Sequence, residues 1–302
     1  MLTMLAPGQG SQTPGMLTAW LELPGVRDQL ELWSKLTRLD LIRLGTTATA
    51  EEITDTAVTQ PLVVATALLA YDEYRKRGEL PADAVVAGHS VGELAAAAIT
   101  EVISADEAVA LAAIRGAEMA KACAQEATTM AAVLGGDEAE VLARLDELDL
   151  VPANRNAAGQ IVAAGPVAAI DELVANPPAK ARTRKLAVAG AFHTRYMAPA
   201  QDAVAAAAAR ITPSAPTRTL LSNSDGRPVT DGADALSKLV TQVTSPVRWD
   251  LCSAHMREAG VAAIVELPPA GALAGIAKRE LKGTPTVAWK TPDDLEKVIE
   301  LG

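Results

Sequence analysis

One short segment limits the fold of this chain more than any other. Residues 86–99 read VAGHSVGELAAAAI, an apolar run that ends in G-x-S-x-G and continues directly into an alanine-rich stretch. The run predicts a buried strand, the alanines predict a helix, and the two glycines around Ser90 predict a turn too tight for flanking side chains. We therefore expect a strand, a turn and a helix that hold Ser90 in a strained backbone conformation.

Such a turn indicates a chemical role for the serine. It lifts Ser90 Oγ clear of the sheet and places it at the N-terminus of the following helix, where backbone N–H groups favour negative charge. A G-x-S-x-G sequence also occurs in ordinary connections between a strand and a helix, which is the alternative interpretation. The strand before it and the helix after it favour a nucleophile.

Composition and charge narrow the class of protein. Of the 302 residues, 49% are hydrophobic and only 3% aromatic, so helices packed closely on aliphatic strands are expected, an α/β fold. The net charge of −10 argues against nucleic acid or an anionic membrane as a partner. We expect no signal peptide and no membrane span. Cys123 and Cys252 lie far apart and no histidine has metal-ligand spacing, so a cytoplasmic protein without metal or cofactor is expected.

Predicted strands and helices alternate along the chain. Strands are expected at 2–6 and 85–87, with a glycine-rich loop after the first. A helix over 61–77 would have its proline in the first turn, and a helix over 104–124 opens with a capping box. Later in the chain, strands are expected at 217–222, 261–267 and 286–290, and helices at 233–243, 249–259 and 272–281.

The pattern changes in the middle of the chain. Strands and helices there follow the order βαββαβ of a ferredoxin-like unit, at 130–136, 137–148, 150–156, 160–164, 167–176 and 183–189. We therefore expect a ferredoxin-like small subdomain over 128–192, inserted into a hydrolase-like large domain with a parallel sheet over 1–127 and 193–302. The active site should lie in the cleft between them.

An arginine stands on the apolar stripe of the helix predicted over 104–124. Arg115 shares that stripe with Ala108, Leu111 and Met119. Spacing alone favours an internal salt bridge, or a side chain that reaches the rim of the domain. The alternative is a site for a ligand carboxylate, which suits the two parallel N–H groups of a guanidinium.

A serine nucleophile needs a base, and the chain offers three histidines. His89 directly precedes the serine, so its side chain should point away from the hydroxyl. His255 lies inside a predicted helix, where a packed or solvated histidine is usual. His193 follows the last strand of the small subdomain, where the chain returns to the large domain, and it is the predicted base. No acid is marked out by spacing to orient its second ring nitrogen, and a backbone carbonyl could serve.

Several motifs together carry a family resemblance. They are PGQGSQ at 7–12, GHSVGE at 88–93, Ile114-Arg115-Gly116, PANRN at 152–156 with Gly159 and Gln160, Ala191-Phe192-His193, and Gln242 ahead of SPVRW at 245–249. In this order, over nearly the whole chain, they resemble the malonyl-CoA:acyl carrier protein transacylases of bacterial fatty acid synthesis, of an actinobacterial type. The resemblance implies an acyltransferase that moves a malonyl group from CoA to the phosphopantetheine thiol of a carrier protein through a malonyl-serine.

The resemblance also implies catalytic roles. Ser90 would be the acylated nucleophile and His193 its base, a dyad in which the main-chain carbonyl of Gln242 accepts from the histidine. Backbone N–H groups of Gln9 and Val91 would form the oxyanion hole.

Substrate-binding residues are implied as well. Arg115 would pair with the free carboxylate of the malonyl group, in place of the salt bridge that its spacing favours. Phe192 would favour malonyl over a branched acyl group. Asn154 and Gln160 match a segment that lines the cleft, although polar turn residues in such a unit need no function. Met119 is expected in the same site.

Malonyl-CoA and an acyl carrier protein are the implied partners. Carrier proteins are acidic and so is this chain, so docking needs a local positive patch. Candidate cations for this patch are Lys180, Arg182, Arg184, Lys185 and Arg195. A solvated strand edge is the alternative interpretation.

Two other functions stay open from the sequence. A serine hydrolase or thioesterase would share Ser90, His193 and the turn, but it needs no arginine on a buried stripe. A catalytically idle module that docks carrier proteins would not need an intact pair of serine and histidine.

Overall fold

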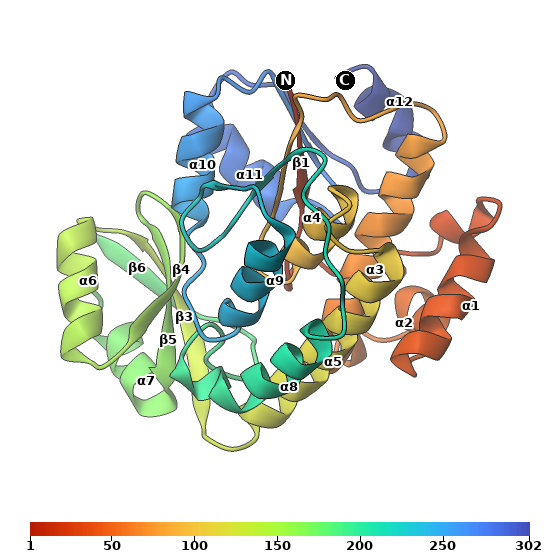
Figure 1. Cartoon of the computed structure of the whole chain (residues 1–302). Coiled ribbons are helices and arrows are strands. Elements are labelled where there is room, and N and C mark those ends of the chain that lie inside the picture. The colour runs from red at the N-terminus through yellow and green to blue at the C-terminus, as the bar shows by residue number, and fades with distance from the viewer.

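The computed structural model describes residues 1–302 and divides them between two β-sheets (Figure 1). The larger sheet has six strands and the smaller has four. Helices surround the larger sheet, and the smaller sheet with two helices stands to one side of it (Figure 1). None of the helices combines the length and the apolar character that a membrane crossing requires.

The larger sheet is built from both ends of the chain. Its strands are β1 (Leu2–Ala6), β2 (Val85–Gly88), β7 (Thr219–Leu221), β8 (Pro228–Val229), β9 (Ala263–Glu266) and β10 (Thr286–Ala288). They follow the order β10-β9-β1-β2-β7-β8, and every pair is parallel except β7 with β8. The helices of this part are α1 (Val26–Thr37), α2 (Leu41–Thr46), α3 (Thr56–Arg75), α4 (Gly92–Ile99), α5 (Ala105–Cys123), α8 (Ala198–Ala208), α9 (Gly232–Thr241), α10 (Trp249–Glu258), α11 (Ala272–Glu280) and α12 (Leu295–Ile299).

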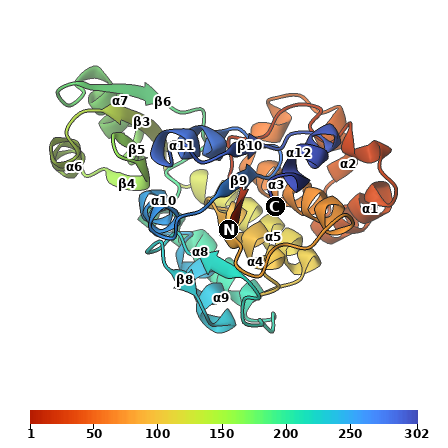
Figure 2. The same cartoon turned by 90° about the horizontal axis from the view of Figure 1, so that it is seen from above.

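Alternate residues of the central strands face opposite sides of the sheet. Met4 and Val86 belong to the main core with α3, α4 and α5, whereas Leu5 and Ala87 belong to a second cluster with Trp249 of α10 and the apolar side chains of α11. Figure 2 shows α4 and α5 on one side of the sheet and α11 on the other. Because both faces are covered, these strands read as continuous apolar runs in the sequence.

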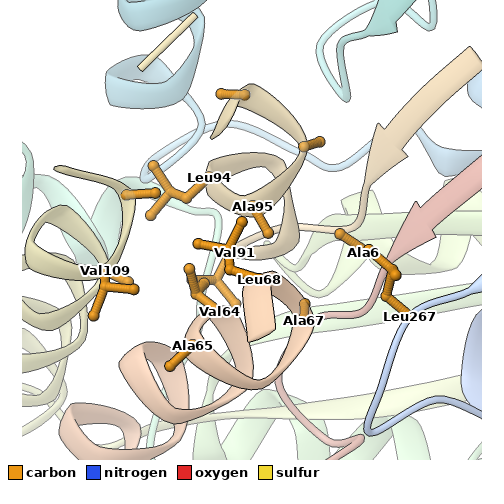
Figure 3. Close-up of a cluster of buried hydrophobic side chains, with 14 of the residues drawn as sticks. Ala6, Val64, Ala65, Ala67, Leu68, Val91, Leu94, Ala95, Val109 and Leu267 are labelled. Atoms are coloured by element: carbon orange, nitrogen blue, oxygen red, sulfur yellow. The ribbon is translucent and has the colours of Figure 1, made fainter. Parts of the chain in front are cut away.

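Helix α4, which follows the turn at Ser90, packs on α3 in the main core. Val91, Leu94 and Ala95 lie beside Val64 and Leu68 of α3 (Figure 3). Seven of the eight residues of α4 are buried, so this helix has no polar face. Its alanines let the two backbones approach closely, and this fixes the helix that begins just after the serine.

The turn at Ser90 has the strained geometry that the glycines predict. Ser90 has a φ of 54°, in the left-handed region that non-glycine residues seldom adopt. A Cβ on Gly88 would lie 2.0 Å from the carbonyl carbon of Gly92. A Cβ on Gly92 would lie 2.3 Å from the carbonyl oxygen of Ala6, at the end of β1. Only glycine fits at either position, so the predicted turn is confirmed.

The smaller sheet has the predicted βαββαβ order. Its elements are β3 (Thr128–Gly135), α6 (Glu138–Glu147), β4 (Val151–Ala157), β5 (Gln160–Pro166), α7 (Val167–Ala175) and β6 (Ala181–Lys185). The strands are antiparallel in the order β4-β5-β3-β6, which confirms the ferredoxin-like arrangement. We propose boundaries at 127/128 and 192/193 for this unit. It joins the larger one where Val247 exchanges backbone hydrogen bonds of 2.9 Å with Ala153 and Arg155.

Two predicted boundaries differ from the structure by more than two residues. Helix α3 begins at Thr56, because the side chain of Asp55 caps it by accepting from the backbone N–H of Ala57, so Pro61 lies in the second turn. Strand β6 ends at Lys185, whereas the prediction extended it to residue 189. The chain then leaves the sheet, and Leu186 and Val188 line the cleft between the two sheets.

Candidate active site

A cavity of about 340 Å³ lies between the two units, beyond the carboxyl ends of β1 and β2. Ligand sites of open parallel sheets occur at this edge. Nine residues that the sequence singled out line it together: Gln9, Ser90, Val91, Arg115, Met119, Asn154, Gln160, Phe192 and His193. Gln242, the tenth, lies behind them and contacts two of them.

Ser90 and His193 form a hydrogen-bonded pair. The distance from Ser90 Oγ to His193 Nε2 is 2.7 Å, and His193 Nδ1 lies 2.8 Å from the carbonyl oxygen of Gln242. A carbonyl oxygen only accepts, so Nδ1 carries the proton and Nε2 of the neutral ring accepts from the serine hydroxyl. Burial, together with the nearby charge of Arg115, lowers the pKa of His193 to about 3. The imidazole is therefore neutral and free to take a proton.

The other two histidines do not reach the serine hydroxyl. His89 Nε2 lies 2.9 Å from Oδ1 of Asn156 on β4, and its ring packs against Trp249 with 5.5 Å between centroids. His89 does line the cavity, which the sequence did not predict. His255 lies on α10, outside the cavity. Of the three histidines, His193 is the one within hydrogen-bond distance of the serine hydroxyl.

Arg115 is buried and holds three neutral partners. It donates to Oε1 of Gln60 at 2.7 Å and to Oε1 of Gln242 at 2.9 Å, and its Nη2 lies 3.4 Å from Ser90 Oγ. None of these atoms belongs to a carboxylate, so the internal salt bridge that the helix spacing favours is not formed. Burial lowers the pKa of Arg115 to about 10, and the charge of Glu93 partly offsets this. The guanidinium stays charged beside the serine.

The sequence analysis missed three polar side chains that support the site. Gln60 on α3 is itself part of the cavity wall, whereas Glu93 on α4 and Asn223, which follows β7, lie behind it. Asn223 accepts from the backbone N–H of Ser90 and donates to the carbonyl oxygen of Gly88, both at 2.8 Å. Glu93 accepts from the side-chain amide of Gln242, and burial raises the pKa of Glu93 to about 8. Glu93 stands three residues after the serine, in a helix that is otherwise apolar, and this position is the signal that could have found it.

Two backbone N–H groups at the cavity have no acceptor within the chain. They belong to Gln9, in the loop after β1, and to Val91, directly after the serine. Gln9 lies in a turn after β1 and Val91 directly precedes α4, so neither group is used by secondary structure.

The other predicted residues surround the cavity. Phe192, the one phenylalanine of the chain, is buried in its wall, as is Met119, whose sulfur accepts from Gln60 at 3.5 Å. Asn154 of β4 is buried. Gln160 lies at the rim, where its Oε1 accepts from Arg279 of α11 at 2.7 Å. That contact joins the two units across the cavity.

Comparisons with known proteins identify the class and then the family. The model of a family described as acyl transferase domain matches residues 3–291, which places the chain among the acyltransferases. A malonyl CoA-acyl carrier protein transacylase from Mycolicibacterium smegmatis is 70% identical over 290 residues, 95% of this chain and 100% of that protein. A crystal structure of MCAT from Mycobacterium tuberculosis is 65% identical, with a TM-score of 0.96 and 99% of each chain covered. The chain belongs to the malonyl CoA-acyl carrier protein transacylase family.

A more distantly similar protein has been solved with a bound partner. A malonyl-transacylase solved in complex with a type II PKS acyl-carrier protein is 29% identical to this chain, with a TM-score of 0.91 and coverage of 100% of this chain and 99% of that one. The family resemblance drawn from the motifs is therefore confirmed along the whole chain.

The lowered pKa of His193 predicts how stability depends on pH. An unfolded histidine binds a proton below its ordinary pKa of 6.5, whereas the folded one stays neutral down to about 3. The unfolded state therefore binds more protons in this window. The contribution of the neutral His193 to the free energy of unfolding is fully present above pH 6.5 and is lost as the pH falls toward 3. Over this range, the free energy of unfolding should decrease by roughly 1 kcal/mol for each unit of pH.

Urea unfolding of the wild type and of His193→Asn measures this contribution. Asparagine tolerates the φ of 60° at this position. Groups such as Glu93, whose raised pKa gives the opposite slope, are present in both proteins and cancel in the difference. The difference in the free energy of unfolding between the wild type and His193→Asn should change with pH below about 6.5. A difference that is constant from neutral to acid pH would contradict the assignment.

Proposed function

We propose that this enzyme transfers a malonyl group from CoA to the phosphopantetheine thiol of an acyl carrier protein, and so supplies fatty acid chain elongation. The observation that carries the proposal is the hydrogen-bonded pair of Ser90 and His193 with the guanidinium of Arg115 beside the serine hydroxyl. That guanidinium has no carboxylate partner. The pair supplies a nucleophile and its base, and the guanidinium supplies a receptor for an acyl group that carries its own carboxylate.

The first half of the reaction loads the serine. His193 Nε2 takes the proton of Ser90 Oγ as the oxygen attacks the thioester carbonyl of malonyl-CoA. The resulting oxyanion accepts hydrogen bonds from the backbone N–H groups of Gln9 and Val91, which have no acceptor within the chain. The intermediate collapses to malonyl-serine, and the leaving CoA sulfur receives the proton from His193. The carbonyl of Gln242 holds the Nδ1–H of the ring throughout.

The second half unloads the serine onto the carrier. The phosphopantetheine thiol gives its proton to His193, and its sulfur attacks the ester carbonyl of the malonyl-serine. Ser90 Oγ leaves and takes the proton back. One thioester replaces another, so the reaction is reversible and transfer requires that water be kept from the ester. The buried walls formed by Phe192 and Met119 support that exclusion.

Malonyl specificity is proposed to come from Arg115, with Phe192, Asn154, Gln160 and Met119 lining the acyl site. In a buried site, a guanidinium whose partners are two amide oxygens retains charge that a carboxylate can neutralise. A hydrolase of uncharged esters would have no use for this charge next to its nucleophile. The two free thiols of the chain support a reducing, cytoplasmic location.

The carrier is proposed to dock on the basic residues around β6. Arg182 and Arg184 are exposed on this edge strand, and Lys180 directly precedes it. Lys185 is paired with Asp171 and Arg195 with Asp149, both at 2.7 Å, so these two offer less charge to a partner. The strand leads into Leu186 and Val188, which line the cavity. The malonyl-transacylase solved with its acyl-carrier protein supports docking of such a partner on this fold.

The dyad can be tested by mass spectrometry after incubation with malonyl-CoA alone. The wild type should gain a stable malonyl adduct, and Ser90→Ala should gain none. His193→Ala should form the adduct more slowly by roughly two to four orders of magnitude, the usual effect of a positioned base. Free malonate without an adduct would indicate a hydrolase, and no reaction would indicate a binding module. His255→Ala, outside the cavity, is the control, and a comparable loss in it would refute the assignment of the base.

Arg115→Ala tests the receptor for the malonyl carboxylate. Breaking a buried pair between a guanidinium and a carboxylate costs on the order of 3 to 5 kcal/mol, so acylation by malonyl-CoA should fall by about two to four orders of magnitude. The weak acylation by acetyl-CoA should persist or improve, and Arg115→Lys should not restore malonyl transfer. The acylation rates of the variants with malonyl-CoA and with acetyl-CoA distinguish a carboxylate receptor from a structural residue. Equal losses for the two, with a lower Tm, would make the arginine a structural residue only.

Charge reversal on β6 tests the docking patch. Arg182→Glu with Arg184→Glu should slow transfer from the loaded enzyme to an acidic carrier by about tenfold, because steering between opposite charges is lost, and added salt should reduce the wild-type rate similarly. Loading by malonyl-CoA should not change, because both side chains are exposed on an edge strand. A loss in loading instead would mean that these arginines hold the phosphates of CoA.

A further inference from the structure

A buried carboxylate lies behind the catalytic residues without touching the cavity. Glu93 is the second residue of α4 and is 5% exposed. It is absent from the cavity lining, and its oxygens contact neither Ser90 nor His193. A buried carboxylate is costly unless both oxygens are hydrogen-bonded. Here each oxygen accepts from a different segment of the chain.

The first oxygen of Glu93 holds the loop that supports the turn at Ser90. Oε1 of Glu93 accepts from the backbone N–H of Asn223 at 2.5 Å. The side chain of Asn223 in turn bonds Gly88 and Ser90 on either side of the turn. Glu93 therefore fixes the loop from which Asn223 reaches the nucleophile.

The second oxygen holds the side chain of Gln242. Oε2 of Glu93 accepts from Nε2 of Gln242, and Oδ1 of Asn223 lies 3.3 Å from the same nitrogen. The amide nitrogen thus faces two acceptors, and the amide oxygen faces Arg115, a donor, at 2.9 Å. A flipped amide would set its NH₂ group against the guanidinium and its oxygen against the carboxylate. The carboxylate of Glu93 therefore selects the one orientation that can hold Arg115.

The group that contacts Arg115 directly also matters. A carboxylate in that position would pair with the guanidinium and compete with any ligand carboxylate. Gln242 presents a neutral amide oxygen there instead, so the N–H group of Arg115 that faces Ser90 stays open to a ligand.

We propose that Glu93 is a positioning residue for malonyl recognition, which acts by fixing the amide of Gln242 so that the amide oxygen faces Arg115. The inference rests on the proposed malonyl transfer. Acetyl groups have no carboxylate, so their transfer depends on Ser90 and His193 but not on this arrangement. The ratio of malonyl to acetyl acylation is therefore the quantity that Glu93 controls.

Glu93→Gln tests this role at constant size. The oxygen of the new amide can still accept from Asn223, but its NH₂ group meets the NH₂ group of Gln242 and forces that amide to flip. Arg115 then loses its acceptor. We expect kcat/KM for acylation by malonyl-CoA to fall at least tenfold more than kcat/KM for acetyl-CoA. Glu73→Gln is the matched control, since Glu73 is a buried glutamate of α3 that pairs with Lys76 outside the site. It should leave the ratio unchanged.

The exchanged double variant, Glu93→Gln with Gln242→Glu, tests the same role if the single variant does not fold. It restores matched donors and acceptors but places a carboxylate directly against Arg115. The malonyl to acetyl ratio should stay at least tenfold below that of the wild type. A wild-type ratio in either variant, or equal losses for both acyl groups, would overturn the inference. If the wild type itself takes no malonyl group, the proposed function fails instead, so the two failures are distinct.

Discussion

The tight turn around Ser90 is the constraint on which the rest of the site depends. A positive φ at a serine costs energy and persists only where the surroundings enforce it. The backbone N–H of His89 donates to the carbonyl oxygen of Ala6, at the end of β1, at 3.0 Å. The side chain of Asn223, which follows β7, forms hydrogen bonds with the backbone of Gly88 and of Ser90. Three neighbouring parallel strands therefore meet at this turn. The register of the sheet sets the position of the nucleophile, and the buried helix α4 leaves the turn no room to relax.

A buried positive charge is the second constraint, and it shapes the groups around it. Moving a guanidinium out of water costs several kcal/mol unless its hydrogen bonds are satisfied, and Arg115 satisfies them with amide oxygens. A carboxylate in direct contact would stabilise the empty protein better but would close the receptor. The same charge helps to lower the pKa of His193, which keeps the base neutral. The charge of Arg115 thus helps to keep His193 neutral and can bind a substrate carboxylate, at the expense of the stability of the empty site.

Sequence reasoning succeeded where a local pattern has one physical solution. The glycines around Ser90 predicted a turn that only glycine fits, and Ser104 with Glu107 predicted a capping box in which both hydrogen bonds are present. Chain order sufficed for the ferredoxin-like unit, because βαββαβ has few compact arrangements. Helix α8 was not predicted, because its alanines form no apolar stripe and it lacks the strand and tight turn that mark the start of the alanine-rich helix α4. The prediction of a salt bridge for Arg115 was wrong because the spacing of residues along a helix shows that a side chain is buried but not which atoms contact it.

The residues that escaped prediction are polar groups whose partners are distant in the chain. Gln60 is 55 residues from Arg115, and Glu93 is 149 residues from Gln242, so no local pattern links them. Glu93 also has an ordinary explanation, because an acid in the first turn of a helix is favourable wherever it lies. What makes it exceptional is that α4 has no polar face. An ionisable residue in a helix that is apolar all round must be buried, and a buried carboxylate must find donors. The same reasoning applies to Gln60, which lies in the stretch of α3 from Thr59 to Ala70 where every side chain is buried, so its burial was visible in the sequence although its partner was not.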